Sequence, residues 1–368
     1  MARKSVVTIL RIVMPLVALV CVVVFPPWNG ILAWLAPLPE TVQEQLDDAV
    51  ERGLDGIIVY VDRGGRSPAH YAAGWKDRIR RIPADPHALF KIASISKLYI
   101  AAAAAKLAHS GRLDLNRTLA EYLPEVADRI QHADRITVRM LLQHRSGIPN
   151  FTDDPAFNWF VPWTDIHKAL ELVLDDPADF EPGTRYRYSN TNYLLVGMIL
   201  DQVLGHPHQE YIRRELLQPL SLTRTFASLA EVDLDELMSG YHHGVDADLK
   251  ELEYAIPGGS MVATAQDVGV FLRSLVGGRL LSKGEQAVYN TVYVYEHTGW
   301  LPGYYSIARY HRDIDAVVVE FVGNTGDSEE LTSNVVYDRV VEILRRERSP
   351  EAQVTGVSPR DRRAISRR

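Results

Sequence analysis

The chain has 368 residues, ordinary apolar and charged content, a formal net charge of −7 and a single cysteine, Cys21. This length suits one large domain or two closely packed ones, and one cysteine excludes an internal disulfide. Both ends of the chain carry more basic than acidic residues, so the body between them is strongly acidic and would repel a phosphate backbone. We therefore expect no nucleic acid as a partner.

Residues 1–40 predict a membrane-associated segment followed by a linker. A basic stub precedes an uncharged apolar run from Ile12 to Phe25, and a span that starts at Ser5 approaches the ~20 residues that a bilayer requires. We favour an uncleaved anchor over a cleaved signal peptide, because small residues are not spaced as a cleavage site requires. The basic residues before the span would leave the body outside the cytoplasm. A secreted protein is the alternative.

The body, residues 41–346, predicts an antiparallel sheet flanked by helices, with a helical insertion. Strand patterns lie near both ends and helical patterns fill the middle, so residues 41–112 and 255–346 would form an α/β part and residues 113–254 a helical part. Residues 347–368 predict a disordered basic tail. The expected strands are 55–61, 69–74, 291–296, 304–310 and 316–322, and the expected helices include 42–52, 138–144, 166–174, 193–203, 209–216, one from a Thr264–Asp267 capping box to Leu275, and 329–346.

The stretch from Phe90 to Leu107, FKIASISKLYIAAAAAKL, organises the rest of the chain. It predicts a buried helix because it is apolar nearly all round. Ser94 and Lys97 are three residues apart, so their side chains share one helical face. A buried lysine is costly unless it is paired or sheds its proton, which is typical of an amine that activates a serine nucleophile. The alternative is a solvated lysine one turn from an N-cap serine.

Two later stretches complete a pattern. Tyr188-Ser189-Asn190 follows a Pro-Gly turn and enters a helix, and His297-Thr298-Gly299-Trp300 stands at the end of an expected strand. Ser-x-x-Lys, Tyr-x-Asn and His-Thr-Gly in this order resemble the serine β-lactamase and penicillin-binding protein superfamily. The resemblance is to the branch that holds class C β-lactamases, D-Ala-D-Ala carboxypeptidases and related esterases. Residues 141–149, 218–225 and 258–265 resemble that branch too.

The resemblance implies a β-lactamase/transpeptidase-like fold and a serine hydrolase that acts through an acyl-enzyme, without a metal or other cofactor. The substrate would be a small molecule or peptide with an ester or peptide bond, including one between D-amino acids. The alternatives are a β-lactamase and a catalytically inactive binding module that resembles penicillin-binding proteins.

The family pattern also implies roles for individual residues. Ser94 would be the nucleophile, and Lys97 and the phenolate of Tyr188 are both candidates for the general base. The backbone N–H groups of Ser94 and Trp300 would match the family's oxyanion hole. The expected substrate-binding residues are Asn190, His297, Thr298, Gly299 and Trp300.

Two positions depart from the family pattern. Trp300 stands where relatives have a small residue, so it would narrow the acyl pocket. His297 stands where β-lactamases carry lysine, and an unperturbed imidazole has a pKa of about 6.5. We therefore expect weak β-lactam turnover, and a loss of activity on carboxylate-bearing substrates above about pH 6.5.

The sequence alone does not decide the roles of several aromatic and histidine residues. Trp159, Phe160 and Trp163 either line the mouth of the cleft or pack the helical part. His206, His208, His242 and His243 lack metal-ligand spacing, so we expect them to face solvent rather than bind zinc.

Overall fold

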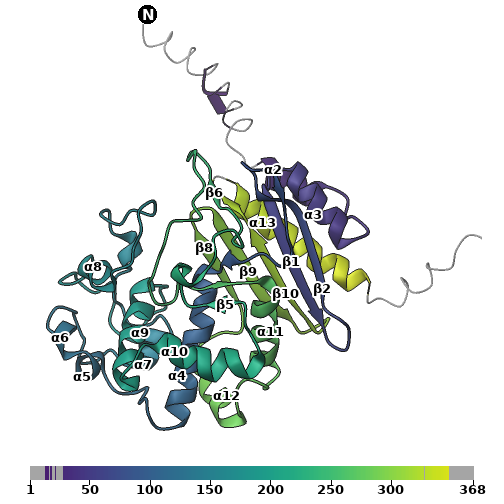
Figure 1. Ribbon diagram of the computed structural model, residues 1–368. Coiled ribbons are helices and arrows are strands. Elements are labelled where there is room, and N and C mark those ends of the chain that lie inside the picture. Colours follow the sequence, from purple (N-terminus) through teal and green to yellow (C-terminus); the bar gives the residue numbers. More distant parts are fainter. Residues whose placement is uncertain (1–12, 16, 19–20, 22–27, 327, 348–368) are drawn as a thin grey trace, which may run out of the picture.

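The computed structural model describes residues 13–15, 17–18, 21, 28–326 and 328–347. Its centre is a six-stranded antiparallel sheet with the order β3-β2-β1-β10-β9-β8 (Figure 1). Strand β1, from the first part of the chain, pairs with β10, from the last part, which confirms the predicted sheet. The strands are β1 (Gly56–Arg63), β2 (Ala69–Asp77), β3 (Ile82–Pro83), β8 (His297–Leu301), β9 (Tyr304–His311) and β10 (Ala316–Val322).

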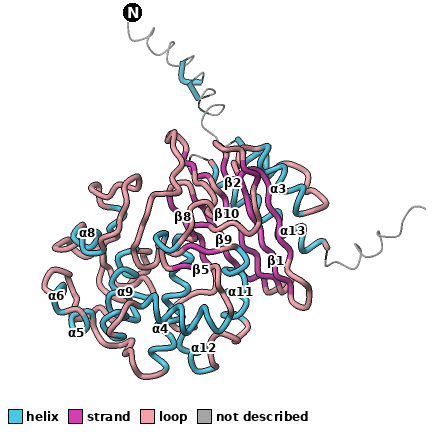
Figure 2. Tube along the Cα trace, viewed as in Figure 1, coloured by secondary structure: helices cyan, strands magenta, loops and turns pink. Residues whose placement is uncertain are grey.

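Helices cover both faces of this sheet (Figure 2). Because side chains of a strand alternate between faces, Ile57 and Val59 of β1 enter one core, and Ile58 and Tyr60 enter the other. Burial on both faces explains why β1 and β10 are almost uninterrupted apolar runs. The helices on the first face are α2 (Trp28–Leu35), α3 (Val42–Glu51) and α13 (Glu329–Arg346), and those packed in the second core are α4 (Ser96–His109), α11 (Ala265–Val276) and α12 (Lys283–Tyr289).

The region between α4 and α11 consists of short helices and long loops. Its longest described helix, α9 (Asn190–Leu204), packs against α4 and α7. The shorter α-helices are α5 (Leu119–Tyr122), α6 (Pro124–Ala127), α7 (Val138–Leu142), α8 (Ile166–Glu171) and α10 (His208–Ile212). Helix α10 continues into the π-helical turn η3 (Arg213–Leu217). The 3₁₀ turns are η2 (Phe151–Asp153), η4 (Gln218–Leu220) and η5 (Leu229–Glu231).

Small strands tie this region to the rest of the molecule. Strand β4 (Phe90–Lys91) pairs with β7 (Val262–Ala263), which also pairs with β5 (Thr225–Phe226). Strand β6 (Tyr241–His242) pairs with β11 (Asn324–Thr325). Strand β4 leads through the 3₁₀ turn η1 (Ala93–Ile95) directly into α4, so this small sheet holds the start of the central helix.

One predicted strand is wrong, and one predicted capping box is only half formed. The strand expected at 291–296 is wrong: this segment is a turn after α12, and the strand begins only at His297. Thr264 caps α11 as predicted, since its hydroxyl accepts the Asp267 N–H. The Asp267 carboxylate does not return the bond, because it accepts from the Arg224 N–H and the Thr225 hydroxyl instead.

The predicted anchor and tail fall largely on residues 1–12, 22–27 and 348–368, which lie outside the described residues. Within the described part of the chain, no helix has the length and apolarity to cross a bilayer.

Candidate active site

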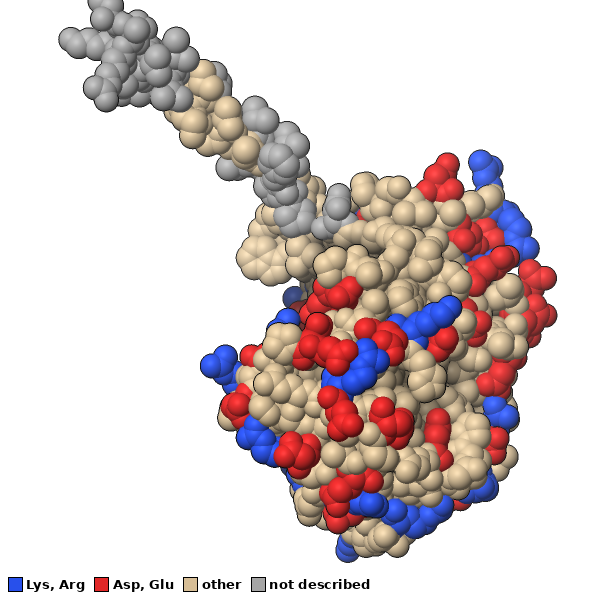
Figure 3. Space-filling model, turned by 90° about the vertical axis from the view of Figure 1, so that its left-hand side faces the viewer, with Lys and Arg blue, Asp and Glu red and all other residues tan. Residues whose placement is uncertain are grey.

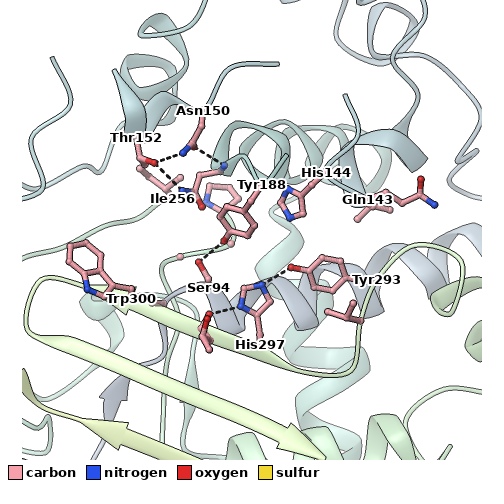
Figure 4. Close-up of a pocket in the computed structure, with 18 of the residues that line it drawn as sticks. Ser94, Gln143, His144, Asn150, Thr152, Tyr188, Ile256, Tyr293, His297 and Trp300 are labelled. Carbon is pink, nitrogen blue, oxygen red and sulfur yellow. Dashed lines mark hydrogen bonds between the residues drawn. The ribbon is translucent and has the colours of Figure 1, made fainter. Parts of the chain in front are cut away.

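A strained turn presents Ser94 at the entry to α4. Ala93 has a φ of 49°, a left-handed conformation that is unfavourable for a residue with a Cβ atom. It turns the chain from β4 into the helix, and Ser94 lines a cavity of about 930 Å³. The residues that form this cavity come from the turn η1 before α4, from α9 and β8, and from loops of the helical region (Figure 4).

Lys97 lies one turn further along and is fully buried. Its Nζ lies 3.1 Å from Ser94 Oγ, 3.0 Å from Asn190 Oδ1 and 2.8 Å from the Gly258 carbonyl oxygen. Burial lowers the pKa of Lys97 to about 7, because the charged ammonium loses its hydration. Gly258 has a φ of 81°, which favours glycine, and a Cβ atom there would lie 3.1 Å from Lys97 Cγ, closer than an ordinary van der Waals contact.

Tyr188 approaches the same hydroxyl from the other side. Its Oη–H donates to Ser94 Oγ over 2.8 Å. Burial raises the pKa of Tyr188 well above its ordinary value, so the phenol is the stable form at neutral pH. The ring stacks on His144 with centroids 4.5 Å apart. The phenolate considered from the sequence is therefore disfavoured before substrate binds.

His144 is itself held in one tautomer. Its Nδ1 accepts the Ser189 N–H over 3.2 Å, and burial together with Lys97 and His297 lowers its pKa to about 3. The hydrogen therefore resides on Nε2, which has no hydrogen-bond partner in the described part of the chain. The neutral imidazole supports the face of the Tyr188 ring without adding charge to the site.

Asn190, the first residue of α9, joins the lysine to a loop of the helical region. Its Oδ1 accepts from Lys97, its Nδ2 donates to Thr152 Oγ1 over 3.2 Å, and its backbone N–H donates to Asn150 Oδ1 over 2.9 Å. Asn150 Nδ2 also donates to Thr152 Oγ1 over 2.7 Å. This network orients polar amide groups beside Ser94 (Figure 4).

Strand β8 forms the opposite wall of the cavity. Thr298 and Trp300 line the cavity, and Gly299 packs against the turn that carries Ser94. A Cβ atom at Gly299 would lie 2.3 Å from the Ile92 carbonyl oxygen, so only glycine lets the strand come this close to the turn. The Trp300 indole Nε1–H donates to Glu330 Oε1 over 2.7 Å.

His297 differs from the expectation of a histidine that titrates near neutrality. Burial and the nearby Lys97 lower its pKa to about 4. Its Nδ1 lies 2.5 Å from the Thr298 carbonyl oxygen, which can only accept, so Nδ1 carries the hydrogen; Nε2 then accepts from the Tyr293 hydroxyl over 2.8 Å. Both nitrogens of the neutral ring are therefore hydrogen-bonded within the protein. The prediction that His297 loses its charge near pH 6.5 is wrong, because the neutral form is already favoured above about pH 4.

A model of the Beta-lactamase family matches residues 38–303, which include the Ser94, Tyr188 and His297 motifs. The chain belongs to the Beta-lactamase family.

Curated members that resemble the chain include Protein flp of Staphylococcus aureus (strain N315), which is 29% identical over 191 residues. The N-acetylmuramyl-L-alanine amidase of Bacillus subtilis (strain 168) is 30% identical over 200 residues. Each alignment covers 50% of this chain but only 38% and 45% of those relatives, so the chain spans less than half of their length.

Solved structures of the family share the fold. The D-amino acid amidase from Ochrobactrum anthropi SV3, complexed with L-phenylalanine amide, has a TM-score of 0.74 and 25% identity, covering 84% of this chain and 98% of that one. A penicillin binding protein from Bacillus halodurans, with a TM-score of 0.68 and 22% identity over 80% of this chain and 98% of that one, matches in fold alone. The predicted superfamily and fold are confirmed.

Within this Beta-lactamase-family fold, six of the predicted site residues line one cavity, and the other two, Lys97 and Gly299, pack directly behind it against Ser94 and its turn. Asn150, Thr152, His144 and Tyr293 also line the cavity, and no sequence pattern had assigned them a role. Asn150 directly follows a stretch that resembles the family, which was the available hint. Trp159 lines the cavity, whereas Trp163 packs behind it on Phe157 with ring centroids 4.6 Å apart.

The described residues include no group of three or more His, Cys, Asp or Glu side chains arranged to hold a metal ion. On the face turned toward the viewer in Figure 3, acidic and basic side chains are interspersed.

Proposed function

We propose that the chain is a serine hydrolase that cleaves an amide or ester bond through an acyl-enzyme, with Ser94 as nucleophile. One observation carries this proposal: Ser94 Oγ lies within hydrogen-bond distance of both a buried lysine whose pKa is lowered to about 7 and a protonated tyrosine. An amine that is neutral near pH 7 is a base suited to neutral conditions.

Lys97 is the base that fits this geometry. A neutral amine has two hydrogens and one lone pair, and the two acceptors Gly258 O and Asn190 Oδ1 engage the hydrogens. The lone pair then faces Ser94 Oγ over 3.1 Å, so the Ser94 hydroxyl donates to Nζ and accepts from the Tyr188 hydroxyl. Ser94 would pass its proton to Lys97 Nζ while Oγ bonds to the carbonyl carbon.

Tyr188 is placed to act as the acid. Its phenol proton would pass to the leaving group as the tetrahedral intermediate collapses, and the phenolate so formed would accept a proton from the water that attacks the acyl-enzyme, while Lys97 returns its proton to Ser94 Oγ as the acyl bond breaks. The backbone N–H groups of Ser94 and Trp300 would stabilise the oxyanion. Asn190 would also contact the substrate amide, with Thr298 and Gly299 along the facing strand.

The side chains that contact Ser94 do not require a carboxylate beside the scissile bond. His297 is neutral and fully engaged, and Lys97 loses its charge near neutral pH, so neither residue is a fixed cation beside Ser94. Arg145 and Arg309 also line the cavity. Similarity to a D-amino acid amidase at 25% identity supports an amide of an amino acid as the first substrate to test. No observation favours β-lactam hydrolysis over cleavage of an amide or ester, and the contacts of Ser94 with Lys97 and Tyr188 weigh against an inactive binding module.

The nucleophile is tested with a fluorophosphonate probe and with a screen of D-amino acid amides, nitrophenyl esters and a cephalosporin. We expect labelling and hydrolysis by the wild type and neither by Ser94→Ala, with an unchanged circular dichroism spectrum. Labelling that persists in Ser94→Ala would assign the reaction to another serine. Folded wild-type protein that reacts with no probe and no substrate would contradict the proposal.

We also propose that the body acts outside the cytoplasm, with the apolar run that ends at Phe25 serving as an anchor or as a secretion signal. The uncharged run and the basic residues before it support this location. Intact-mass analysis of the protein made in a bacterial host distinguishes the two forms. A start between Trp28 and Pro39 identifies a cleaved signal, and a retained Met1 with membrane fractionation identifies an anchor.

A further inference from the structure

One end of the cavity is walled by aromatic rings. The rings of Trp159 and Trp300 meet edge to face with centroids 5.1 Å apart, and Phe157 meets Trp159 in the same way at 4.8 Å. The ring centroid of Tyr254 lies 6.0 Å from that of Trp159. All four side chains line the cavity, although they come from three separate segments of the chain. We call these four residues the aromatic wall.

Contacts outside the cavity hold this wall in place. The Glu330 carboxylate, in the first turn of α13, accepts from the Trp300 indole and, over 3.2 Å, from the Gly326 N–H. The Tyr254 hydroxyl donates to the Trp159 carbonyl oxygen. A surface that is already ordered binds a ligand without the entropy cost of arranging its side chains.

The wall lies on the acyl side of Ser94 in the proposed reaction. Figure 4 shows Trp300 on one side of Ser94, with His144 and Tyr293 on the other. The leaving group must approach Tyr188 to receive a proton, and Tyr188 is stacked on His144. The acyl group, on the opposite side of the carbonyl carbon, then extends toward Trp300 and Trp159.

We propose that the aromatic wall is a binding subsite for a planar aromatic group on the acyl part of the substrate. This inference rests on the proposed serine hydrolase function and names its substrate class. The cavity has a volume of about 930 Å³ with Trp300 in place, so the indole lines the cavity without filling it. Aromatic rings stack favourably on such surfaces beyond the burial of their area.

The test compares two esters with one leaving group, p-nitrophenyl phenylacetate and p-nitrophenyl acetate, each corrected for its rate of alkaline hydrolysis. We expect wild-type kcat/KM to favour the phenylacetyl ester by about tenfold or more. Trp159→Ala should remove most of this preference. Trp75→Ala, which removes a tryptophan with 37% exposure from β2, is the matched control and should leave the ratio unchanged.

Glu330 is a positioning residue and has its own pair of variants. Glu330→Gln keeps an oxygen that can accept from the Trp300 indole, so the preference should survive. Glu330→Ala removes the acceptor and should lower the ratio through a higher KM for the phenylacetyl ester. A wild-type ratio near one, or a ratio that Trp159→Ala leaves unchanged, would overturn the subsite.

Binding to Ser94→Ala separates the subsite from catalysis. Calorimetry should detect phenylacetamide, and Trp159→Ala added to this background should weaken its binding by about tenfold. Acetamide, which lacks the ring, should bind at least that much more weakly than phenylacetamide. If no ester is hydrolysed but phenylacetamide binds in this way, the proposed function fails and the subsite stands. If phenylacetamide binds no better than acetamide, the subsite fails whatever the outcome for hydrolysis.

Discussion

Lys91 and Lys97 lie on either side of Ser94 and are both buried, with exposed fractions of 5% and 1%. Burial lowers the pKa of each to about 7. Lys91 Nζ donates to the carbonyl oxygens of Leu249 and Leu252, over 3.0 and 2.6 Å. Lys97 Nζ instead reaches the hydroxyl of Ser94 beside an open cavity.

The two lysines have similar lowered pKa values, but their surroundings suit them to different roles. Asp248 and Glu253 favour the charged form of Lys91, which suits an ammonium that ties a loop to β4. Burial is the cause of the lowered pKa of Lys97, and no acid among the described residues offsets it. A lowered pKa therefore does not identify a catalytic amine; a nucleophile within reach and space for a substrate do.

The largest difference should appear when each lysine is replaced by methionine. Lys97→Met removes the base, so kcat/KM on an active ester should fall by about 10²–10⁴-fold. Lys91→Met touches no reacting atom, and the loss should be far smaller. Equal losses in two variants that both fold, as judged by circular dichroism, would contradict the distinction between the two lysines.

The pH profile should sharpen the same comparison. Since Lys97 must be neutral to accept the Ser94 proton, kcat/KM for a neutral ester should fall about tenfold per pH unit below its pKa of about 7 and level off above it. The profile of Lys91→Met should keep this midpoint. If the midpoint moves in Lys91→Met, the titrating group is Lys91, and the assignment of this pKa to Lys97 is wrong.

A buried acid on the other face of the sheet extends the comparison to stability. Burial raises the pKa of Glu320 in β10 to about 8; Ser333 donates to its Oε1, and its Oε2 has no hydrogen-bond partner among the described residues. Between its ordinary pKa of 4.5 and about 8, the folded state binds more protons than the unfolded state, so stability falls as pH rises through this window.

Glu320→Gln tests this linkage because glutamine has no proton to lose. The difference in unfolding free energy, variant minus wild type, should rise by up to about 1.4 kcal/mol per pH unit within the window and become constant above about pH 8. Urea denaturation at a series of pH values measures it. A difference that does not change with pH would show that Glu320 is ionised or solvated in the folded protein.

The smallest effect should come from His297. Because burial lowers its pKa to about 4, the ratio of kcat/KM for a carboxylate-bearing ester to that for a neutral ester should stay flat from about pH 5.5 to 8.5, a range around the reference histidine value. His297→Lys should raise this ratio by introducing a cation. A wild-type ratio that falls through this range would restore the titrating histidine expected from the sequence.

Local patterns were enough to predict much of this protein. The apolar run Ala316–Val322 became β10, the helical pattern Glu329–Arg346 became α13, and three motifs predicted the family. Such features depend on the spacing of neighbouring residues, because backbone periodicity decides which side chains share a face. Ser94 and Lys97 could be paired for the same reason.

Only the tertiary structure decided the surroundings of those residues. The segment 291–296 has the composition of a strand but lies in a turn, since the pairing partner of β9 begins at His297. The roles of Asn150 and Glu330, and the low pKa of His297, depend on segments distant in sequence that meet at the cavity. Burial and hydrogen bonding are properties of the folded surroundings, so a residue's type and its neighbours along the chain do not specify them.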